Sequence, residues 1–187
     1  PYLKDIVSEW GVPEEKIWLI YNGIELPPNI RAKEKNPGEF LIVSAGRKVP
    51  WKGFEAIERF EKSHPNWKVF IASGLAREEA LGWIKTADVF VLNYSYEGFP
   101  HVLIEAMTLG TPVIVTDLRA TQSLVIQGET GLRVPVNDNS ALEQALLNVA
   151  TKPVEAKQRA IAGQELMKRF EIAFMLDVTA QFLKQLV

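Results

Sequence analysis

The chain has 187 residues, which is long enough for one domain with a sizeable hydrophobic core. Its 47% hydrophobic and 24% charged content is ordinary for a globular protein, and a formal net charge of -2 excludes any general attraction for nucleic acid or anionic membranes. Because the chain contains no cysteine, disulfides and thiolate metal sites are excluded as well.

The first 28 residues differ in pattern from the rest. We expect a helix over Leu3–Trp10, a turn, a short strand over Ile17–Gly23 (IWLIYNG) and a linker containing Pro27 and Pro28. The chain begins with Pro1 rather than methionine, so we expect a processed or excised piece. No apolar run reaches the roughly 20 residues that cross a bilayer, so we expect no membrane span. The absence of cysteine is compatible with a reducing cytoplasm, and we expect a cytoplasmic location.

Five short apolar runs, rich in Val, Ile and Phe, are typical of strands buried on both faces. They are Phe40–Gly46, Lys68–Gly74, Ala87–Asn93, Pro112–Asp117 and Gly131–Pro135. Helical patterns separate the strands, over residues 52–63, 76–86, 100–109 and 118–127, and three more follow over 137–150, 154–169 and 171–187. This alternation predicts an α/β fold with an open parallel sheet flanked by helices.

The loop after the first strand, SAGRKVPWKG (Ser44–Gly53), carries two candidate anion-binding residues. In an open parallel sheet the ligand lies at the carboxyl ends of the strands. Arg47 offers a planar fork and Lys52 a point charge, and both suit phosphate oxygens. The alternative is that these side chains are solvated surface charges.

A second loop, NYSYEGFPH, follows the strand over Ala87–Asn93 and leads into a helix. Gly98 permits close backbone approach, and Pro100 suits the first helical turn, where its missing N–H costs nothing. We expect free N–H groups near Phe99, His101 and Val102 to face the crevice as a socket for an anion.

Two carboxylates flank this turn. Glu97 precedes it and could accept hydrogen bonds from a hydroxylated group beside the anion, or could cap the helix instead. Glu105 lies four residues beyond His101, so both project from one helix face. Because Glu105 sits within the apolar sequence VLIEAM, where an unpaired carboxylate is costly, we expect it to face a ligand rather than to be an incidental surface residue.

The spacing Glu97-x7-Glu105, within EGFPHVLIEAMTLGTPVIVTD, resembles the motif of retaining glycosyltransferases of the GT-B fold, specifically glycosyltransferase family 4. Two further segments strengthen the resemblance: SAGRKVPWKG is similar to the family's Gly-Arg…Lys-Gly loop, which begins here at Gly46, and GETGLRVPVND (Gly128–Asp138) to its segment after the last core strand. VPEEKIWLIYNGIE is similar to the family's inter-lobe connection. The resemblance therefore implies an inter-lobe segment over residues 1–28 and a Rossmann-like nucleotide-sugar-binding domain over residues 29–187.

The resemblance also implies roles for the candidate residues. Arg47 and Lys52 would hold the donor diphosphate, Glu97 would contact the transferred sugar, and Glu105 would bind the ribose. The backbone of residues 98–101 (Gly98, Phe99, Pro100 and His101) would face the sugar and phosphates. We expect no metal and no other cofactor, since those cations suffice for the diphosphate and no Asp-x-Asp or histidine-rich cluster is present.

The sequence departs from the family pattern in three respects. Only one of two lobes is present, so we expect the chain to bind donor but to need an N-terminal lobe for acceptor binding and transfer. After Gly74 a helix and an edge strand are missing, together with loops that help to seat the nucleobase. DLRATQS (Asp117–Ser123) replaces a segment that usually carries paired glycines and a glutamate.

The leading hypothesis is the donor-binding lobe of a retaining transferase that uses a nucleotide-diphosphate sugar in carbohydrate biosynthesis. The alternative is a non-catalytic, shortened lobe that acts as an interaction or scaffold module, which the missing segment favours. A dinucleotide-dependent oxidoreductase is disfavoured, because no G-x-G-x-x-G follows a strand.

Overall fold

The computed structural model describes residues 2–185 and contains a five-stranded, wholly parallel sheet in the order β2-β1-β3-β4-β5. This confirms the predicted fold class and all five predicted strands. The order is what remains of the doubly wound order 3-2-1-4-5-6 when its outermost strand is removed. The strands are β1 (Phe40–Ala45), β2 (Trp67–Ala72), β3 (Val89–Leu92), β4 (Val113–Thr116) and β5 (Leu132–Val134).

The centre of the sheet forms the core of the domain. Every residue of β3 and β4 is buried, as continuous apolar strands require when helices cover both faces. β1 pairs with β2 along its whole length, from Phe40 opposite Trp67 to Ala45 opposite Ala72. Among residues 2–185 β2 has no further neighbour in the sheet, so the shortened connection after Gly74 leaves β2 at the edge.

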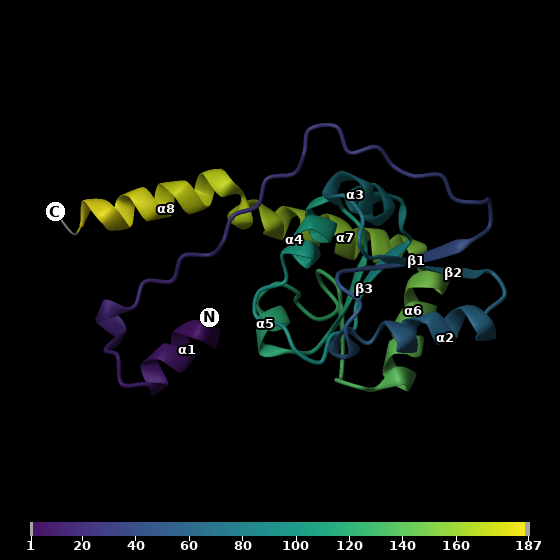
Figure 1. The fold of residues 1–187 in the computed structure, drawn as a ribbon, viewed down its shortest axis with the longest axis horizontal. Helices are drawn as coiled ribbons and strands as arrows, with labels where there is room; N and C mark the ends of the chain where they lie inside the picture. Colours follow the sequence, from purple (N-terminus) through teal and green to yellow (C-terminus); the bar gives the residue numbers. More distant parts are fainter. Residues whose placement is uncertain (1, 186–187) are drawn as a thin grey trace.

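Helices cover the two faces of the sheet (Figure 1). α3 (Arg77–Thr86), α4 (His101–Thr108) and α7 (Pro153–Met167) lie on one face, and α2 (Phe54–Ser63) and α6 (Asn139–Thr151) lie on the other. α6 begins at a side-chain cap, because Asp138 accepts a hydrogen bond from the Ala141 N–H at 2.9 Å.

α1 and α8, near the two ends of the described chain, lie on the same side of the sheet domain (Figure 1). α1 (Tyr2–Glu9) leads into an extended segment, and α8 (Ile172–Lys184) projects from the body with none of its residues buried. The predicted last helix is present up to Lys184, and its expected end at 186–187 lies outside the described residues. None of the helices within residues 2–185 is long and apolar enough to cross a membrane.

The strand predicted over Ile17–Gly23 is wrong. The segment is extended but pairs with no strand among the described residues, and only Ile24 forms an isolated bridge, with Glu171 at the start of α8. Its apolar side chains pack on the C-terminal part of the chain instead of forming a strand of the sheet. Trp18 packs on Phe182 of α8 with ring centroids 4.8 Å apart, and Tyr21 packs on Phe170 at 5.1 Å.

The helix predicted over residues 118–127 is mostly wrong, because α5 covers only Arg119–Gln122. Thr121 fixes the start of this helix. Its hydroxyl donates to the carbonyls of Thr116 and Leu118 and accepts from the Leu118 N–H, so the side chain caps the first turn of α5. The chain then turns back into β5.

Candidate functional site

The loops at the carboxyl ends of β1 and β3 and the start of α4 meet at one edge of the sheet. The loop after β1 is bounded by two glycines with positive φ, Gly46 at +134° and Gly53 at +60°. A methyl group added at Gly46 would lie 2.4 Å from Nζ of Lys52, so the lysine side chain folds back over the loop backbone. Arg47 remains exposed to solvent.

Tyr94 holds Lys52 in place from the neighbouring strand. The Lys52 ammonium donates to the Tyr94 hydroxyl at 2.9 Å, and the hydroxyl in turn donates to the carbonyl of Ala45 at the end of β1. Tyr94 is 1% exposed, and burial, followed by the nearby charge of Glu97, raises its pKa. The neutral phenol therefore acts as a fixed support for the cation.

Lys52, Arg47 and Glu97 form one electrostatic group. Burial is the largest influence on Lys52 and lowers its pKa; the Arg47 charge acts in the same direction, and Glu97 opposes both. A bound anion would stabilise the charged form of this half-buried ammonium, because the anion replaces the hydration that burial removes. The group is thus suited to a phosphate or another strong anion.

The turn before α4 differs in detail from the prediction. Pro100 occupies the position just before the helix, where its side chain makes no capping hydrogen bond, and His101 is the first helical residue. The His101 N–H is not free, since it donates to the Phe99 carbonyl at 3.0 Å, and the Gly98 N–H donates to a Glu97 carboxylate oxygen at 2.8 Å. The amides of Phe99 and Val102 have no acceptor among residues 2–185 and are left for a ligand.

Gly98 was expected to permit a close backbone approach, but no other part of the described chain comes close to it. A methyl group added there would meet nothing within 4 Å. The backbone at this turn faces open space rather than another part of the chain. An approaching ligand could therefore reach the peptide directly.

His101 contacts residues 17–28, the connecting segment between the N-terminal helices and the sheet domain, whereas Glu105 contacts α3. The His101 ring lies 3.4 Å from the Asn22 amide. Glu105 forms an ion pair with Arg77, the first residue of α3, at 2.7 Å. The side chain of Glu105 is only 12% exposed, so its carboxylate is held at the protein surface within a contact and does not extend into bulk solvent.

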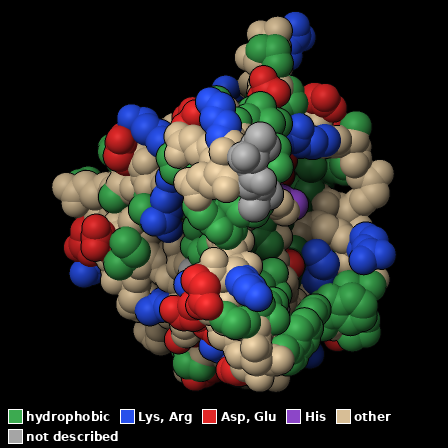
Figure 2. Space-filling model, turned by 90° about the vertical axis from the view of Figure 1, so that its left-hand side faces the viewer, with side chains coloured by type: hydrophobic (Ala, Val, Ile, Leu, Met, Phe, Trp, Pro, Cys, Tyr) green, Lys and Arg blue, Asp and Glu red, His purple; other side chains and the backbone are tan. Residues whose placement is uncertain are grey.

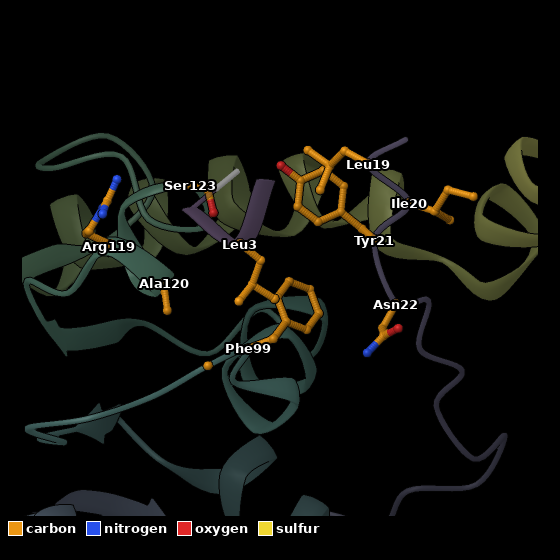
Figure 3. Close-up of a pocket in the computed structure, with 10 residues that line it drawn as sticks. Leu3, Leu19, Ile20, Tyr21, Asn22, Phe99, Arg119, Ala120 and Ser123 are labelled. Atoms are coloured by element: carbon orange, nitrogen blue, oxygen red, sulfur yellow. The ribbon is translucent and has the colours of Figure 1, made fainter. Parts of the chain in front are cut away.

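A cavity of about 130 Å³ adjoins the turn at Gly98, between the sheet domain and the N-terminal segment (Figure 3). Leu3 of α1, Tyr21 and Phe99 point toward one another across it, and Arg119 and Ser123 lie on the α5 side. Tyr21 and Phe99 are partly stacked, with ring centroids 6.1 Å apart. An apolar hollow therefore lies next to the backbone predicted to face a sugar.

The structure brings Arg47, Lys52 and Glu97 together and places the start of α4 beside them. Glu105 lies further along α4 and contacts Arg77. Sequence reasoning missed Tyr94 and Arg77. Both hold a predicted site residue from a different element, and only the spacing of Tyr94 three residues before Glu97 could have drawn attention to it. Within the described residues, no three His, Cys, Asp or Glu side chains gather as a metal ion would require.

The fold and site define a Rossmann-like lobe of the GT-B type. Residues 24–152 match the family model described as glycosyl transferases group 1, and the chain therefore belongs to this family. The chain is 28% identical to glycogen synthase of Mycobacterium tuberculosis over 95% of its length and 50% of that protein. It is 37% identical to phosphatidyl-myo-inositol mannosyltransferase of Mycobacterium leprae over 47% of its length and 24% of that protein. It thus spans half or less of these relatives.

Solved structures agree with the fold. Sucrose-phosphate synthase from Thermosynechococcus elongatus superposes with a TM-score of 0.72 at 26% identity, covering 81% of this chain and 46% of that one. Anabaena Alr3699/HepE in complex with UDP superposes with a TM-score of 0.79 at 16% identity, covering 97% and 61%. The C-terminal domain of a glycosyl transferase group 1 family protein from Francisella tularensis is covered over 96% of its length, at a TM-score of 0.66 and 19% identity.

Proposed function

We propose that this chain is the donor-binding lobe of a retaining glycosyltransferase of the family 4 type, and that it binds a nucleotide-diphosphate sugar. The observation that supports this most is the cluster of Lys52, Arg47 and Glu97 beside the free amides of the α4 turn. A diphosphate carries the charge that two cations and a helix start attract. The UDP bound in the structural neighbour from Anabaena fits the same class of ligand.

The proposed chemistry follows from charge. Breaking the bond between the anomeric carbon and the diphosphate leaves negative charge on the leaving group. Lys52, Arg47 and the start of α4 would stabilise this charge as it grows, because they are fixed before the reaction begins. Glu97 would hold hydroxyls of the transferred sugar. In this scheme the cations take the role that a metal ion has in other transferases.

We propose further that transfer requires a second lobe, which would bind the acceptor. Two features support this. The chain spans only half of the glycogen synthase that it resembles. In addition, α8 exposes large apolar side chains, including Phe174, Leu176 and Leu183, each more than half exposed. Figure 2 shows hydrophobic side chains among the charged ones on the face from which α8 projects.

Calorimetric titration of the 187-residue chain with UDP, GDP and ADP and with their glucose conjugates tests the proposal. At least one should bind with micromolar to millimolar affinity. Arg47→Ala and Lys52→Ala should each weaken binding about tenfold or more, since a charge-assisted hydrogen bond contributes about 1.5–3 kcal/mol.

Lys48→Ala is the matched control, because Lys48 is an exposed cation of the same loop that lies beside a different hollow, lined by Glu55 and Asn137. It should leave the affinity unchanged. If the wild-type chain binds none of these nucleotides, the donor-binding proposal fails, and a non-catalytic interaction module becomes the better interpretation.

A further inference from the structure

Arg77 joins three elements through one guanidinium group. It is the first residue of α3, in the short connection that follows β2. Its Nε donates to Oε1 of Glu105 at 2.8 Å, and its Nη2 approaches the same oxygen at 2.7 Å. Nη2 also donates to the carbonyl of Glu25 in the connecting segment at 2.8 Å.

Arg77 contacts only one of the two carboxylate oxygens of Glu105. Both guanidinium nitrogens meet Oε1, and Oε2 of Glu105 has no hydrogen-bond partner among the described residues. The Glu105 side chain is 12% exposed and that of Arg77 is 50% exposed, so the arginine reaches in from the surface while the carboxylate stays largely covered. One oxygen is therefore anchored and the other is left to accept.

We propose that Arg77 is a positioning residue for nucleotide binding: it fixes Glu105 so that Oε2 accepts a hydrogen bond from a ribose hydroxyl. The inference rests on the proposed function, which assigns the ribose to Glu105. It adds the residue that sets the geometry of this carboxylate. The bond to the Glu25 carbonyl extends the same restraint to the connecting segment.

The physical reason is pre-organisation. A glutamate side chain has three rotatable bonds, and ordering it when the ligand binds would cost affinity. An arginine fork that holds one oxygen removes most of that freedom beforehand. The restraint acts only on the ribose contact, so it should matter only for ligands that carry ribose hydroxyls.

The experiment compares the full 187-residue chain with its Arg77→Ala variant by calorimetry. The ligands are UDP, GDP and ADP and the 2′,3′-dideoxy counterpart of whichever binds best. We expect Arg77→Ala to weaken binding of the ribonucleotide about tenfold and to leave the dideoxynucleotide unchanged. In a Glu105→Gln background the same substitution should have less than a twofold effect.

Arg31→Ala is the matched control, because Arg31 is an exposed arginine of the loop that lies along α3 and its side chain makes no hydrogen bond or ion pair with the described residues. It should bind both ligands as the wild type does. Urea unfolding of each variant, together with Arg77→Lys, which keeps the charge but not the fork, separates a loss of fold from a loss of positioning. Arg77→Lys should bind the ribonucleotide more weakly than the wild type.

Three results would overturn the inference. An unchanged ribonucleotide affinity in Arg77→Ala would show that Arg77 has no part in binding. An equal loss for ribo- and dideoxynucleotides would show that it contacts the ligand directly or supports the fold. A wild-type chain that binds none of the three nucleotides would remove the proposed function itself, and that outcome is distinct because it appears before any substitution is made.

Discussion

Tyr94 links the end of β1 to the cation that we assign to the donor phosphate. Its hydroxyl donates to the Ala45 carbonyl and accepts from Lys52, so one oxygen both secures the backbone and orients the ammonium. Because the ring is 1% exposed and Ala45 is 4% exposed, the Ala45 carbonyl would lose its donor without a ready replacement if the hydroxyl were removed. Stability and ligand affinity should therefore depend on this one group together.

Tyr94→Phe removes that hydroxyl and keeps the ring. We expect the free energy of unfolding to fall by about 1–2 kcal/mol, because a buried carbonyl loses its donor, and nucleotide affinity to fall as Lys52 loses its acceptor. Urea denaturation and calorimetric titration measure the two effects. Tyr96→Phe, at a position 68% exposed in the same loop, should change neither. Equal stability of the two variants would contradict the assignment.

The titration of Lys52 gives a prediction for pH. Burial and Arg47 lower the pKa of Lys52 in the free protein, and a bound diphosphate should raise it by stabilising the ammonium. Between these two pKa values binding takes up a proton. Nucleotide affinity should therefore decrease as the pH rises through the alkaline range below the ordinary lysine pKa.

Calorimetry at a series of pH values from about 7 to about 10 checks this dependence. Lys52→Arg is the comparison, because an arginine stays protonated throughout that range. Its affinity should change much less with pH. A wild-type affinity that stays constant over the whole series would argue against Lys52 as a ligand of the phosphate.

For single residues, the sequence identified the charged side chains of the site but not the side chains that hold them in position. Arg47, Lys52, Glu97 and Glu105 could be chosen because cations and carboxylates after parallel strands suit a charged, hydroxylated ligand. Tyr94 and Arg77 hold these side chains through contacts 42 and 28 residues apart in the chain. Such contacts depend on how elements pack, which local patterns do not contain.

The loop between β1 and α2 is shaped by close packing as well as by charge. Gly53 adopts φ +60°, and a methyl group added there would lie 2.5 Å from the Asn93 carbonyl. The Asn93 side chain also donates to the Gly53 carbonyl at 3.2 Å. The first loop and the end of β3 are therefore in direct backbone contact, which sets the spacing between the two halves of the site.

Gly53→Ala should lower the free energy of unfolding by about 3 kcal/mol, because a left-handed conformation and a steric overlap are both penalised. Gly38→Ala is the control. Gly38 has φ +81° but open space around it, so it should lose only the conformational part, about 1 kcal/mol. Urea unfolding of the two variants measures the difference. Equal losses would show that the contact with Asn93 relaxes without cost.

The pattern of elements was predictable where burial is uniform. Five continuous apolar runs became the five strands, and the central strands β3 and β4, which helices cover on both faces, are buried at every residue. Prediction failed where an apolar run packs on something other than a sheet. The run over residues 17–23 packs on α8 and on Phe170, and of the helix expected over residues 118–127 only Arg119–Gln122 is present.

In the molecule as a whole, helices cover both faces of the sheet, whereas α8 projects from it with no buried residue. Ile172, Leu176 and Leu183 of α8 lie four and seven residues apart, so they share one face, and all three are exposed. A mainly apolar helix of this kind is normally buried against a partner. The proposed second lobe would supply that cover.

Without that cover the chain should self-associate as its concentration rises. Sedimentation velocity over a concentration series measures this, and Leu176→Gln with Leu183→Gln should reduce the association. Nucleotide affinity should stay the same, because neither side chain approaches the cationic loop. A wild-type chain that sediments as a monomer at every concentration would show that α8 needs no partner.

A pair of backbone hydrogen bonds joins the connecting segment to the start of α8. The Ile24 N–H donates to the Phe170 carbonyl at 2.8 Å, and the Ile172 N–H donates back to the Ile24 carbonyl at 3.1 Å. A methyl group at Gly23 would lie 2.5 Å from the Ile172 backbone, so only glycine fits at this position beside the start of α8. Because the two segments share these hydrogen bonds, moving either one away from the sheet domain would break bonds that the other also makes.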